Sequence, residues 1–414
     1  MRAPTVDDVV GRMRAAAGPL TPFGAEVTAF AADLSRALRR DPVTRADPAV
    51  AALAYWIRPA HLVQLQQEWQ IRNDRDDRIV RVPRGVVFHI PPTNVDTLFV
   101  YSWLLSALAG NANVIRLSPS VESTALLRVI DDVLAQHPIV AGATVFVRYG
   151  HDDARTAELS TADVRVIWGG DDTVAAIRRV PLAPHATELV FPDRFSFALL
   201  DASAVRTSSE AELKDLATRF FNDAYWFDQL GCASPRLVVW RGDRQSTAAA
   251  AERFYDALAQ ELVRREHTTA TGAVIAKLVH AADSAAAGRV ESIVWDRSDL
   301  TIAQLRALDS VVRDGPGGGL FYDVRIEELS ELAAHVVRRD QTLTHYGFSA
   351  EELRALARTL NGRGVDRLVP VGQALTFDRF WDGYDLLGSF TRCVVVDPVP
   401  QTLAAPAARA DQNA

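Results

Sequence analysis

Apolar and polar positions change their spacing along the chain, and these changes divide it into sections. Residues 1–75 carry apolar side chains three and four positions apart, for example Val27, Phe30, Leu34 and Leu38. This spacing is typical of amphipathic helices whose apolar stripe packs on a larger body. We therefore predict a helical cap at the start of the chain, followed by a domain of a different kind.

From residue 86 onward, short and nearly continuous apolar runs alternate with longer amphipathic segments. The runs predict strands at 86–90, 113–117, 143–147 and 164–167, with helices at about 96–109, 122–136, 152–159 and 173–179. Continuous apolar strands are typical of a parallel sheet that is covered on both faces. Because strand–helix–strand units wind in one hand, the pattern predicts an α/β fold with a doubly wound parallel sheet.

A second α/β section begins near residue 206. It predicts helices at about 208–222, 246–265, 326–338 and 349–360, with strands at 237–240, 320–322, 367–372 and 390–396. Ser349 followed by Glu352 is the capping-box pattern of a helix start. The run Gly-Pro-Gly-Gly-Gly at 315–319 predicts a flexible loop, with a plain hinge as the simplest interpretation, and residues 266–310 show no clear period.

Composition narrows the classes of function. The 414 residues carry a formal net charge of -7, so no global positive field attracts nucleic acid or an anionic membrane. Two cysteines cannot form a disulfide framework, which fits a reducing cytoplasm. The first residues lack the features of a signal peptide, and no apolar run is long enough to span a membrane. Because HExxH and paired CxxC motifs are absent, we expect no metal site.

Several predicted strands end in residues that are suited to binding a ligand. Parallel sheets bind ligands at the carboxyl ends of their strands, where this chain places Pro92, Arg116 with Ser118, and the run 168–171. A Gly-Gly turn that opens a helix can lie close to a pyrophosphate, because the helix N-terminus attracts anions. The GxGxxG spacing is absent, so the pattern alone leaves a dinucleotide site open.

Cys232 lies in a short loop between a predicted helix and a buried strand, within Gly-Cys-Ala-Ser-Pro. A thiolate there could attack an acyl carbonyl, and a side-chain amide such as that of Asn94 could stabilise the resulting oxyanion. The simpler alternatives are a packed thiol at Cys232 and ordinary turn chemistry at Asn94. The residues by themselves leave both alternatives open.

Taken in order, six segments resemble the aldehyde dehydrogenase superfamily and, within it, the acyl-CoA (fatty-acyl) reductases of bacterial bioluminescence. Four of them resemble superfamily elements, and two resemble elements particular to the reductase branch. The superfamily elements are 85–94, 107–116, 168–174 and 231–235, and the branch elements are 341–344 and 381–383. The resemblance covers about residues 75 to 398.

The resemblance implies a mechanism and a set of site residues. Cys232 would be the nucleophile, Asn94 and the Cys232 N–H would bind the oxyanion, and NADPH would reduce the acyl-enzyme to an aldehyde. The implied cofactor residues are Pro92, Arg116, Ser118, Trp168, Gly169, Gly170 and Asp171. Arg116 replaces the family's ribose-binding lysine, which favours NADPH over NADH because an arginine can pair with a 2′-phosphate. The alternative for Arg116 is a surface charge at a strand end.

The hydrophobic pattern, the composition and the resemblance together predict how the chain divides. We predict the helical cap and an NAD(P)-binding domain at 1–205, a catalytic domain at 206–385, a C-terminal strand at 386–400 and a disordered tail at 401–414. Strand 390–396 resembles the one through which this superfamily pairs subunits, so a homodimer and an intramolecular edge strand both remain open. Expected partners are acyl-CoA or another activated acyl donor, and an acyl-transfer protein.

One departure from the superfamily bears on the reaction. Glu188 matches the general base of aldehyde-oxidising members, but the Gly-Gly-Lys that should follow is replaced by Val190, Phe191 and Pro192 after Leu189. A reductase needs no base to activate water, so this segment favours reduction of a thioester. Two alternatives remain, namely an aldehyde dehydrogenase with Glu188 as its base, and a non-catalytic scaffold of the same fold.

Overall fold

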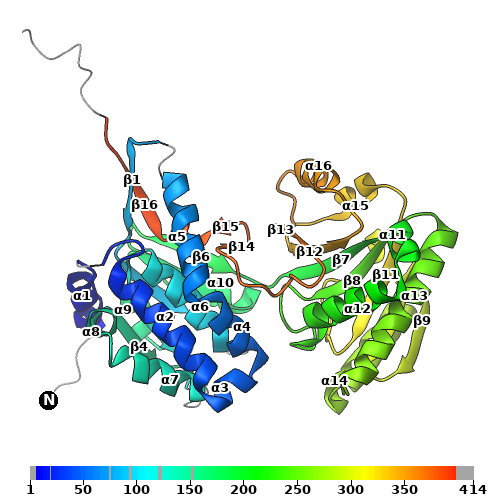
Figure 1. Cartoon of the computed structure of the whole chain (residues 1–414), viewed down its shortest axis with the longest axis horizontal. Coiled ribbons are helices and arrows are strands. Elements are labelled where there is room, and N and C mark those ends of the chain that lie inside the picture. Colours follow the sequence, from blue (N-terminus) through cyan, green and yellow to red (C-terminus); the bar gives the residue numbers. More distant parts are fainter. Residues whose placement is uncertain are drawn as a thin grey trace, which may run out of the picture. The chain divides into compact units, whose positions relative to one another are not determined.

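The computed structural model describes residues 6–18, 20–73, 76–92, 96–119, 124–150 and 153–397, and its chain folds into two compact units (Figure 1). Unit 1 consists of Met1–Trp168, Ala175–Val190 and Leu386–Ala414, and unit 2 consists of Gly169–Val174 and Phe191–Asp385. The predicted tail at 401–414 lies outside the described residues.

Unit 1 begins with the predicted helical segment, drawn in blue in Figure 1. Asp41 and Asp47 each cap a helix that starts with proline, since their carboxylates accept the first free N–H groups. Prolines therefore start new helices here. The helices are α1 (Val6–Ala17), α2 (Ala25–Arg40), α3 (Pro42–Ala46), α4 (Pro48–Trp56) and α5 (Pro59–Asn73).

A five-stranded sheet forms the core of unit 1, in the order β4-β3-β2-β5-β6. The pairs β2–β3, β2–β5 and β3–β4 are parallel, as the alternating pattern predicts. The strands are β2 (Val86–Ile90), β3 (Ala112–Leu117), β4 (Thr144–Arg148), β5 (Val164–Trp168) and β6 (Thr187–Phe191). The helices of this section are α6 (Asp96–Leu108), α7 (Ala125–Leu134), α8 (Pro138–Gly142), α9 (Arg155–Leu159) and α10 (Asp171–Arg178).

The C-terminal part of the chain returns to unit 1. After α17 (Leu386–Ser389), strand β16 (Thr391–Val395) pairs antiparallel with β1 (Ile79–Pro83). Strand β16 was expected from the sequence, whereas β1 was not. The predicted C-terminal strand is therefore paired within its own chain along one edge.

Unit 2 is built on a seven-stranded sheet in the order β13-β12-β7-β8-β11-β10-β9, in which only the β9–β10 pair is antiparallel among the described pairs. The strands are β7 (Phe195–Asp201), β8 (Pro235–Arg241), β9 (Val290–Arg297), β10 (Leu300–Leu305), β11 (Leu320–Ile326), β12 (Asp340–Tyr346) and β13 (Arg367–Pro370). A separate hairpin joins β14 (Phe380–Trp381) to β15 (Tyr384–Asp385).

Successive residues of the central strands enter two different cores. Leu199 and Val239 belong to one apolar cluster, whereas Leu200 and Trp240 belong to the other, because strand side chains alternate between faces. Figure 1 shows α12 and α13 side by side against this sheet. The helices are α11 (Ala202–Thr207), α12 (Glu210–Tyr225), α13 (Arg244–Arg264), α14 (Thr271–Ala286), α15 (Leu329–His335), α16 (Ala350–Leu360) and the 3₁₀ turn η1 (Leu308–Ser310).

Two expectations for this section need correction. Strand β11 continues through Ile326, so the helix expected at 326–338 is shorter and is followed by the unpredicted strand β12. The region 266–310, which shows no clear period, contains α14, β9 and β10. Among the described residues, no helix is long and apolar enough to cross a membrane.

Candidate active site

Cys232 lies in the loop between α12 and β8 and is exposed to solvent. Ser196, on β7, holds this loop: its hydroxyl donates to the Cys232 carbonyl at 2.7 Å and accepts the Thr342 N–H of β12 at 3.2 Å. The carbonyl of the candidate nucleophile is therefore fixed to two strands of the sheet. The exposure of the residue favours a nucleophile over a packed thiol at this position.

A second anchor of the loop is Gln229, which is completely buried and has a left-handed backbone. Its side-chain amide donates to the carbonyls of Pro235 (3.1 Å) and Leu320 (3.0 Å) and accepts the Gly319 N–H at 2.8 Å. One neutral side chain thus ties the start and the end of the Cys232 loop to the glycine-rich segment before β11. Sequence reasoning missed this residue, because its role depends on partners far along the chain.

The glycine-rich run at 315–319 is closely packed, in contrast to the flexible loop expected. A Cβ on Gly319 would come within 2.0 Å of the Asp299 carbonyl oxygen, and one on Gly317 within 2.3 Å of the Asp228 carbonyl oxygen. The buried Lys277 ammonium donates to the Gly318 carbonyl at 2.8 Å. Glycine is required here by close backbone approach as well as by positive φ, so the run forms a fixed support for the Cys232 loop.

The surroundings of Cys232 do not favour a free thiolate. Desolvation by nearby protein atoms is the largest influence and raises the pKa of the thiol, and the negative charge of Asp382 raises it further. Arg236 and the main-chain N–H of Arg194, which donates to the sulfur, act in the opposite direction. Solvent accessibility determines whether a substrate can reach the sulfur, whereas desolvation determines its charge. The thiol therefore needs a group that accepts its proton.

The two segments that resemble reductase-branch elements meet in unit 2. Gln341, on β12, donates its side-chain amide to the Asp382 carboxylate at the tip of the β14–β15 hairpin. Arg194 lies between two carboxylates: it is bonded to Asp366, and its Nε is 3.6 Å from an Asp382 oxygen. Burial raises the pKa of Asp382 to about 6, although Arg194 and Gln341 oppose the shift. Sequence reasoning singled out this segment but gave Asp382 no role.

Glu188, the candidate base of the alternative oxidation reaction, is held by two arginines of unit 1. Arg165 donates to one of its carboxylate oxygens at 3.0 and 2.6 Å, and Arg178 donates to the other at 2.7 Å. The Arg165 side chain is only 2% exposed, so its charge depends on this partner. Both oxygens of Glu188 are therefore occupied by ion pairs.

The candidate cofactor residues of unit 1 follow the ends of β2, β3 and β5. Arg116 is 3% exposed, and its guanidinium donates to the Tyr149 carbonyl at 3.2 and 3.1 Å. The alternative that Arg116 is a surface charge is therefore wrong. Pro92 and Ser118 are partly exposed at the same edge of the sheet, and Asn94 lies outside the described residues.

Trp168 ends β5, and Gly169 and Gly170 lead into α10. The N-terminus of this helix already has an anionic partner. The Asp171 N–H donates to the Asp193 carboxylate at 3.2 Å, and the Asp193 N–H donates to Asp171 at 3.3 Å. A pyrophosphate near this turn would therefore have to use the backbone of the two glycines, because the first helical N–H is occupied.

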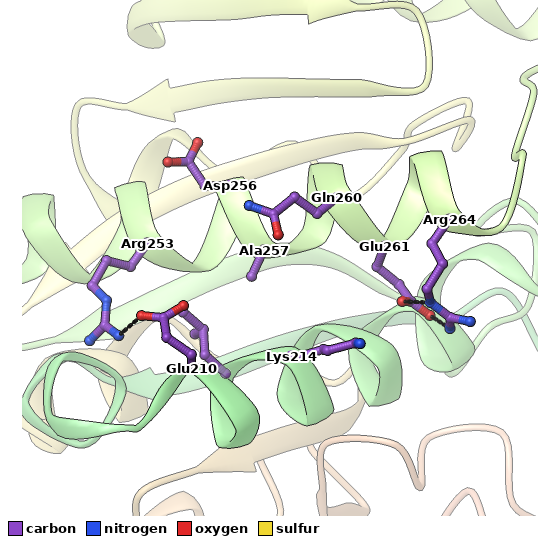
Figure 2. Close-up of a pocket in the computed structure, with 9 residues that line it drawn as sticks. Glu210, Lys214, Arg253, Asp256, Ala257, Gln260, Glu261 and Arg264 are labelled. Atoms are coloured by element: carbon purple, nitrogen blue, oxygen red, sulfur yellow. Dashed lines mark hydrogen bonds and ion pairs between the residues drawn. The ribbon is translucent and has the colours of Figure 1, made fainter.

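A groove between α12 and α13 has a volume of about 430 Å³, but none of the predicted site residues lines it. Figure 2 shows that most of its charges pair with each other: Arg253 binds Glu210, and Arg264 binds Glu261. Lys214 projects along the same groove. Because its charges are largely neutralised locally and it lies away from the Cys232 loop, we assign it no role. Among the described residues, no cluster of metal-binding side chains is found.

A family model described as acyl-CoA reductase (LuxC) matches residues 62–281, which is 220 of the 414 residues. The chain belongs to the LuxC acyl-CoA reductase family. The matched stretch contains Cys232 and all the candidate cofactor residues, and the match confirms the predicted branch of the aldehyde dehydrogenase superfamily.

Two curated relatives of this LuxC family member carry related names. It is 30% identical over 186 residues to "Long-chain acyl-protein thioester reductase 2" of Photobacterium leiognathi, and 30% identical over 185 residues to "Long-chain acyl-protein thioester reductase" of Vibrio harveyi. Each match covers 44% of this chain and 36% of the relative. The chain thus spans about a third of the length of these relatives.

Solved structures confirm the predicted fold class. Aldehyde dehydrogenase 21 from Physcomitrella patens has a TM-score of 0.67 at 11% identity, covering 95% of this chain and 90% of the other. A lactaldehyde dehydrogenase gives 0.65 at 13% identity, covering 94% and 90%. At these identities the likeness concerns the fold alone.

Proposed function

We propose that this LuxC family member reduces an activated acyl group to an aldehyde with NADPH, through a thioester on Cys232. The Cys232 sulfur attacks the acyl carbonyl and expels the donor's thiol. Hydride transfer to the acyl-enzyme then gives a hemithioacetal, which collapses to the aldehyde and the free cysteine. The observation that carries the proposal is the accessible thiol of Cys232, on a loop fixed to the unit 2 sheet in a chain of this family.

The state of Glu188 favours reduction over oxidation. Oxidation of an aldehyde to an acid requires a base that activates water to hydrolyse the thioester. Both carboxylate oxygens of Glu188 are bonded to arginines, which supports a structural role for this residue. Because Glu188 is not free to activate water, a thioester on Cys232 loses the superfamily's route to hydrolysis and can receive hydride instead.

NADPH is proposed as the cofactor on the chemistry of the sheet edge in unit 1. Arg116 places a guanidinium at the end of β3, but it is buried and bonded to the Tyr149 carbonyl, so pairing with a 2′-phosphate would require it to turn away from that carbonyl. Pro92, Ser118 and Trp168 would contact the rest of the nucleotide. The backbone of Gly169 and Gly170 would approach the pyrophosphate, beside the Asp171–Asp193 pair. When bound, the cofactor supplies the hydride, and NADH remains the weaker alternative.

The names of the curated relatives support a long-chain acyl thioester as the donor, carried by a protein or by CoA. Asn94 and the Cys232 N–H are proposed to stabilise the oxyanion. The domain roles predicted from the sequence are proposed in the same way, with cofactor binding in the first part of the chain and thioester chemistry in the second. An acyl-transfer protein and a homodimer are proposed as partners.

The chain offers a matched control for testing this function. Cys393, on β16 of unit 1, is the other exposed cysteine. With a long-chain acyl-CoA and NADPH, C232S should lower the rate of aldehyde formation at least about 10³-fold, because a serine hydroxyl is a much weaker nucleophile than a cysteine thiol. C393S should retain the rate, and both variants should bind NADPH. Aldehyde formation by C232S at the normal rate would overturn the proposal. A wild-type protein that binds NADPH and forms no aldehyde would favour the scaffold alternative.

A further inference from the structure

Asp382 occupies an uncommon position for a turn residue. The β14–β15 pairing leaves Asp382 and Gly383 as a two-residue connection, and both have positive φ, of 49° and 77°. This is the geometry of a tight hairpin turn, in which Asp-Gly is a favoured pair. Such turns normally lie in solvent, yet Asp382 is only 5% exposed. The hairpin therefore places a carboxylate inside unit 2.

The charge of this carboxylate is only partly compensated. Its hydrogen-bond donor is the neutral amide of Gln341, and the Nε of Arg194 lies at 3.6 Å. Arg194 is more closely bonded to Asp366. Arg367 contributes attraction from β13, and Asp366 contributes repulsion. Asp382 thus lacks the close ion pair that neutralises Glu188 in unit 1.

The segments that hold Asp382 also hold Cys232. The Arg194 side chain faces Asp382, while the Arg194 N–H donates to the Cys232 sulfur. On β12, the Gln341 side chain binds Asp382, while the N–H of the next residue, Thr342, binds the hydroxyl that fixes the Cys232 carbonyl. Two short segments, 194–196 and 341–342, therefore join the carboxylate to the thiol loop.

We propose that Asp382 is the proton acceptor and donor for Cys232, a role that rests on the proposed reduction of a thioester. As the sulfur attacks the acyl carbon, the Sγ–H bond breaks and its proton moves through one water molecule to the Asp382 carboxylate, because no direct hydrogen bond joins the two side chains. The bond between the acyl carbon and the donor's sulfur then breaks, and the leaving thiolate takes that proton. After hydride transfer, the hemithioacetal alkoxide expels the Cys232 thiolate, which receives one proton from solvent through Asp382.

The charges around both groups agree with this role. Burial raises the pKa of Asp382 to about 6, so the carboxylate is mostly ionised at neutral pH yet can hold a proton. Desolvation by nearby protein atoms and the Asp382 charge raise the pKa of Cys232, so the sulfur keeps its proton until a base accepts it. The other charged groups that act on the thiol are Arg236 and Asp193, which have opposite signs. General bases act best when their pKa lies near the working pH.

The test combines turnover with alkylation of Cys232, in a C393S background of the full chain. D382N should lower kcat for aldehyde formation about 100-fold, the usual contribution of an acid–base group. Because it removes a negative charge near the sulfur, the same variant should increase the rate of iodoacetamide labelling at pH 7 about tenfold. Loss of turnover together with faster labelling is not expected from a merely disturbed loop.

Asp323 provides the matched control, because it is another buried aspartate of unit 2 with a pKa raised to about 6. Its carboxylate binds the Trp240 and Tyr255 side chains, and it does not act on the thiol. D323N should leave both kcat and labelling at the wild-type level. Full turnover in D382N would overturn the role of Asp382 and leave the proposed function standing, whereas an inactive wild type would overturn the proposed function.

The wild-type pH profile tests the role even if D382N fails to fold. Protonated Asp382 cannot accept the Sγ proton, so kcat should fall below about pH 6. D382N, where it folds, should lose this acid limb. A wild-type kcat that stays constant between pH 5 and pH 7 would overturn the role.

Discussion

Glu188 of unit 1 and three buried aspartates of unit 2 are compensated in opposite ways, although unit 2 also pairs other buried carboxylates, such as Asp340, with arginine. In unit 1, Glu188 is bonded to two arginines, one at each carboxylate oxygen. In unit 2, Asp223, Asp323 and Asp382 accept hydrogen bonds mainly from backbone N–H groups or neutral side chains. Burial dominates there and raises the pKa of Asp223 to about 7 and those of the other two to about 6.

This difference separates structural acids from acids that can exchange protons. A carboxylate in a double ion pair stabilises the fold, and protonating it would leave buried guanidinium charge unpaired. A buried carboxylate with neutral donors titrates near neutral pH, as proton transfer requires. Glu188, which matches the superfamily's base by sequence, is a structural acid. Asp382, which shares its supporting segments with the Cys232 loop, is an acid that can exchange protons.

The largest effect should come from breaking the ion pairs of unit 1. E188Q removes the charge that compensates Arg165, a nearly buried guanidinium, and should lower the free energy of unfolding by about 3 kcal/mol. Turnover per folded molecule should stay near the wild-type value. Urea denaturation and the acyl-CoA assay measure the two quantities. A folded E188Q protein that has lost turnover would contradict the contrast and restore Glu188 as a base.

D323N, in unit 2, should change the free energy of unfolding less than E188Q does. At neutral pH the change should have the opposite sign, so that the variant is more stable than the wild type. Burial raises the pKa of Asp323 to about 6, above the ordinary value of 3.8, so the folded state binds its proton more tightly than the unfolded state does. Its stabilising contribution is complete below about pH 4 and is lost as pH rises through about 6. D323N should therefore remove about 2 kcal/mol of the decline in unfolding free energy between pH 4 and pH 7.5.

Trp240, whose indole N–H donates to the Asp323 carboxylate, provides a local fluorescence probe for that measurement. Denaturation curves at pH 4.5, 6 and 7.5 should lie closer together in D323N than in the wild type, and Asp382, whose pKa is also raised to about 6, should preserve part of the separation. Asp223 should leave a residual slope near pH 7, since its pKa is also raised. If the denaturation curves of D323N stayed as far apart as those of the wild type, the raised pKa of Asp323 would not be a cause of the pH dependence of stability.

Local pattern predicted most of the fold, and sequence-distant contacts account for what it missed. The strands of the unit 1 sheet were predicted where each is one continuous apolar run, as in β2 and β5. Strands β6 and β7 lie in one apolar stretch divided only by Pro192, Asp193 and Arg194, which conceals two elements. Helix α14 buries Lys277 while its Ile275 is exposed, so its polarity does not follow the usual amphipathic rule.

The residues of the candidate site also differ in whether a local sequence pattern could predict them. Cys232 could be named from its own short segment, because Gly-Cys-Ala between a helix and a strand is a local pattern. The sequence drew attention to the segment of Asp382 but could not predict that this residue is buried. Its burial depends on Gln341 and on Arg194, which is 188 positions earlier in the chain. An Asp-Gly turn predicts a hairpin, but no local pattern shows that its carboxylate faces inward.

The smallest effect is expected where a carboxylate is exposed. Glu352 belongs to the capping box that the sequence predicted for α16, in which Ser349 accepts the Glu352 N–H and Glu352 accepts the Ser349 N–H. S349A should lower the unfolding free energy by about 1 kcal/mol, because water can replace part of the lost cap. Glu352 keeps its contact to Arg241 at 2.6 Å.

S209A, in the equivalent capping box of α12, is the matched variant. Its Glu212 lacks a comparable arginine contact among the described pairs, so S209A should lower the free energy of unfolding slightly more than S349A does. If S349A lowered the unfolding free energy as much as E188Q does, burial would not decide how much a carboxylate contributes to stability. The contrast between Glu188 and the aspartates with neutral donors would then need another cause.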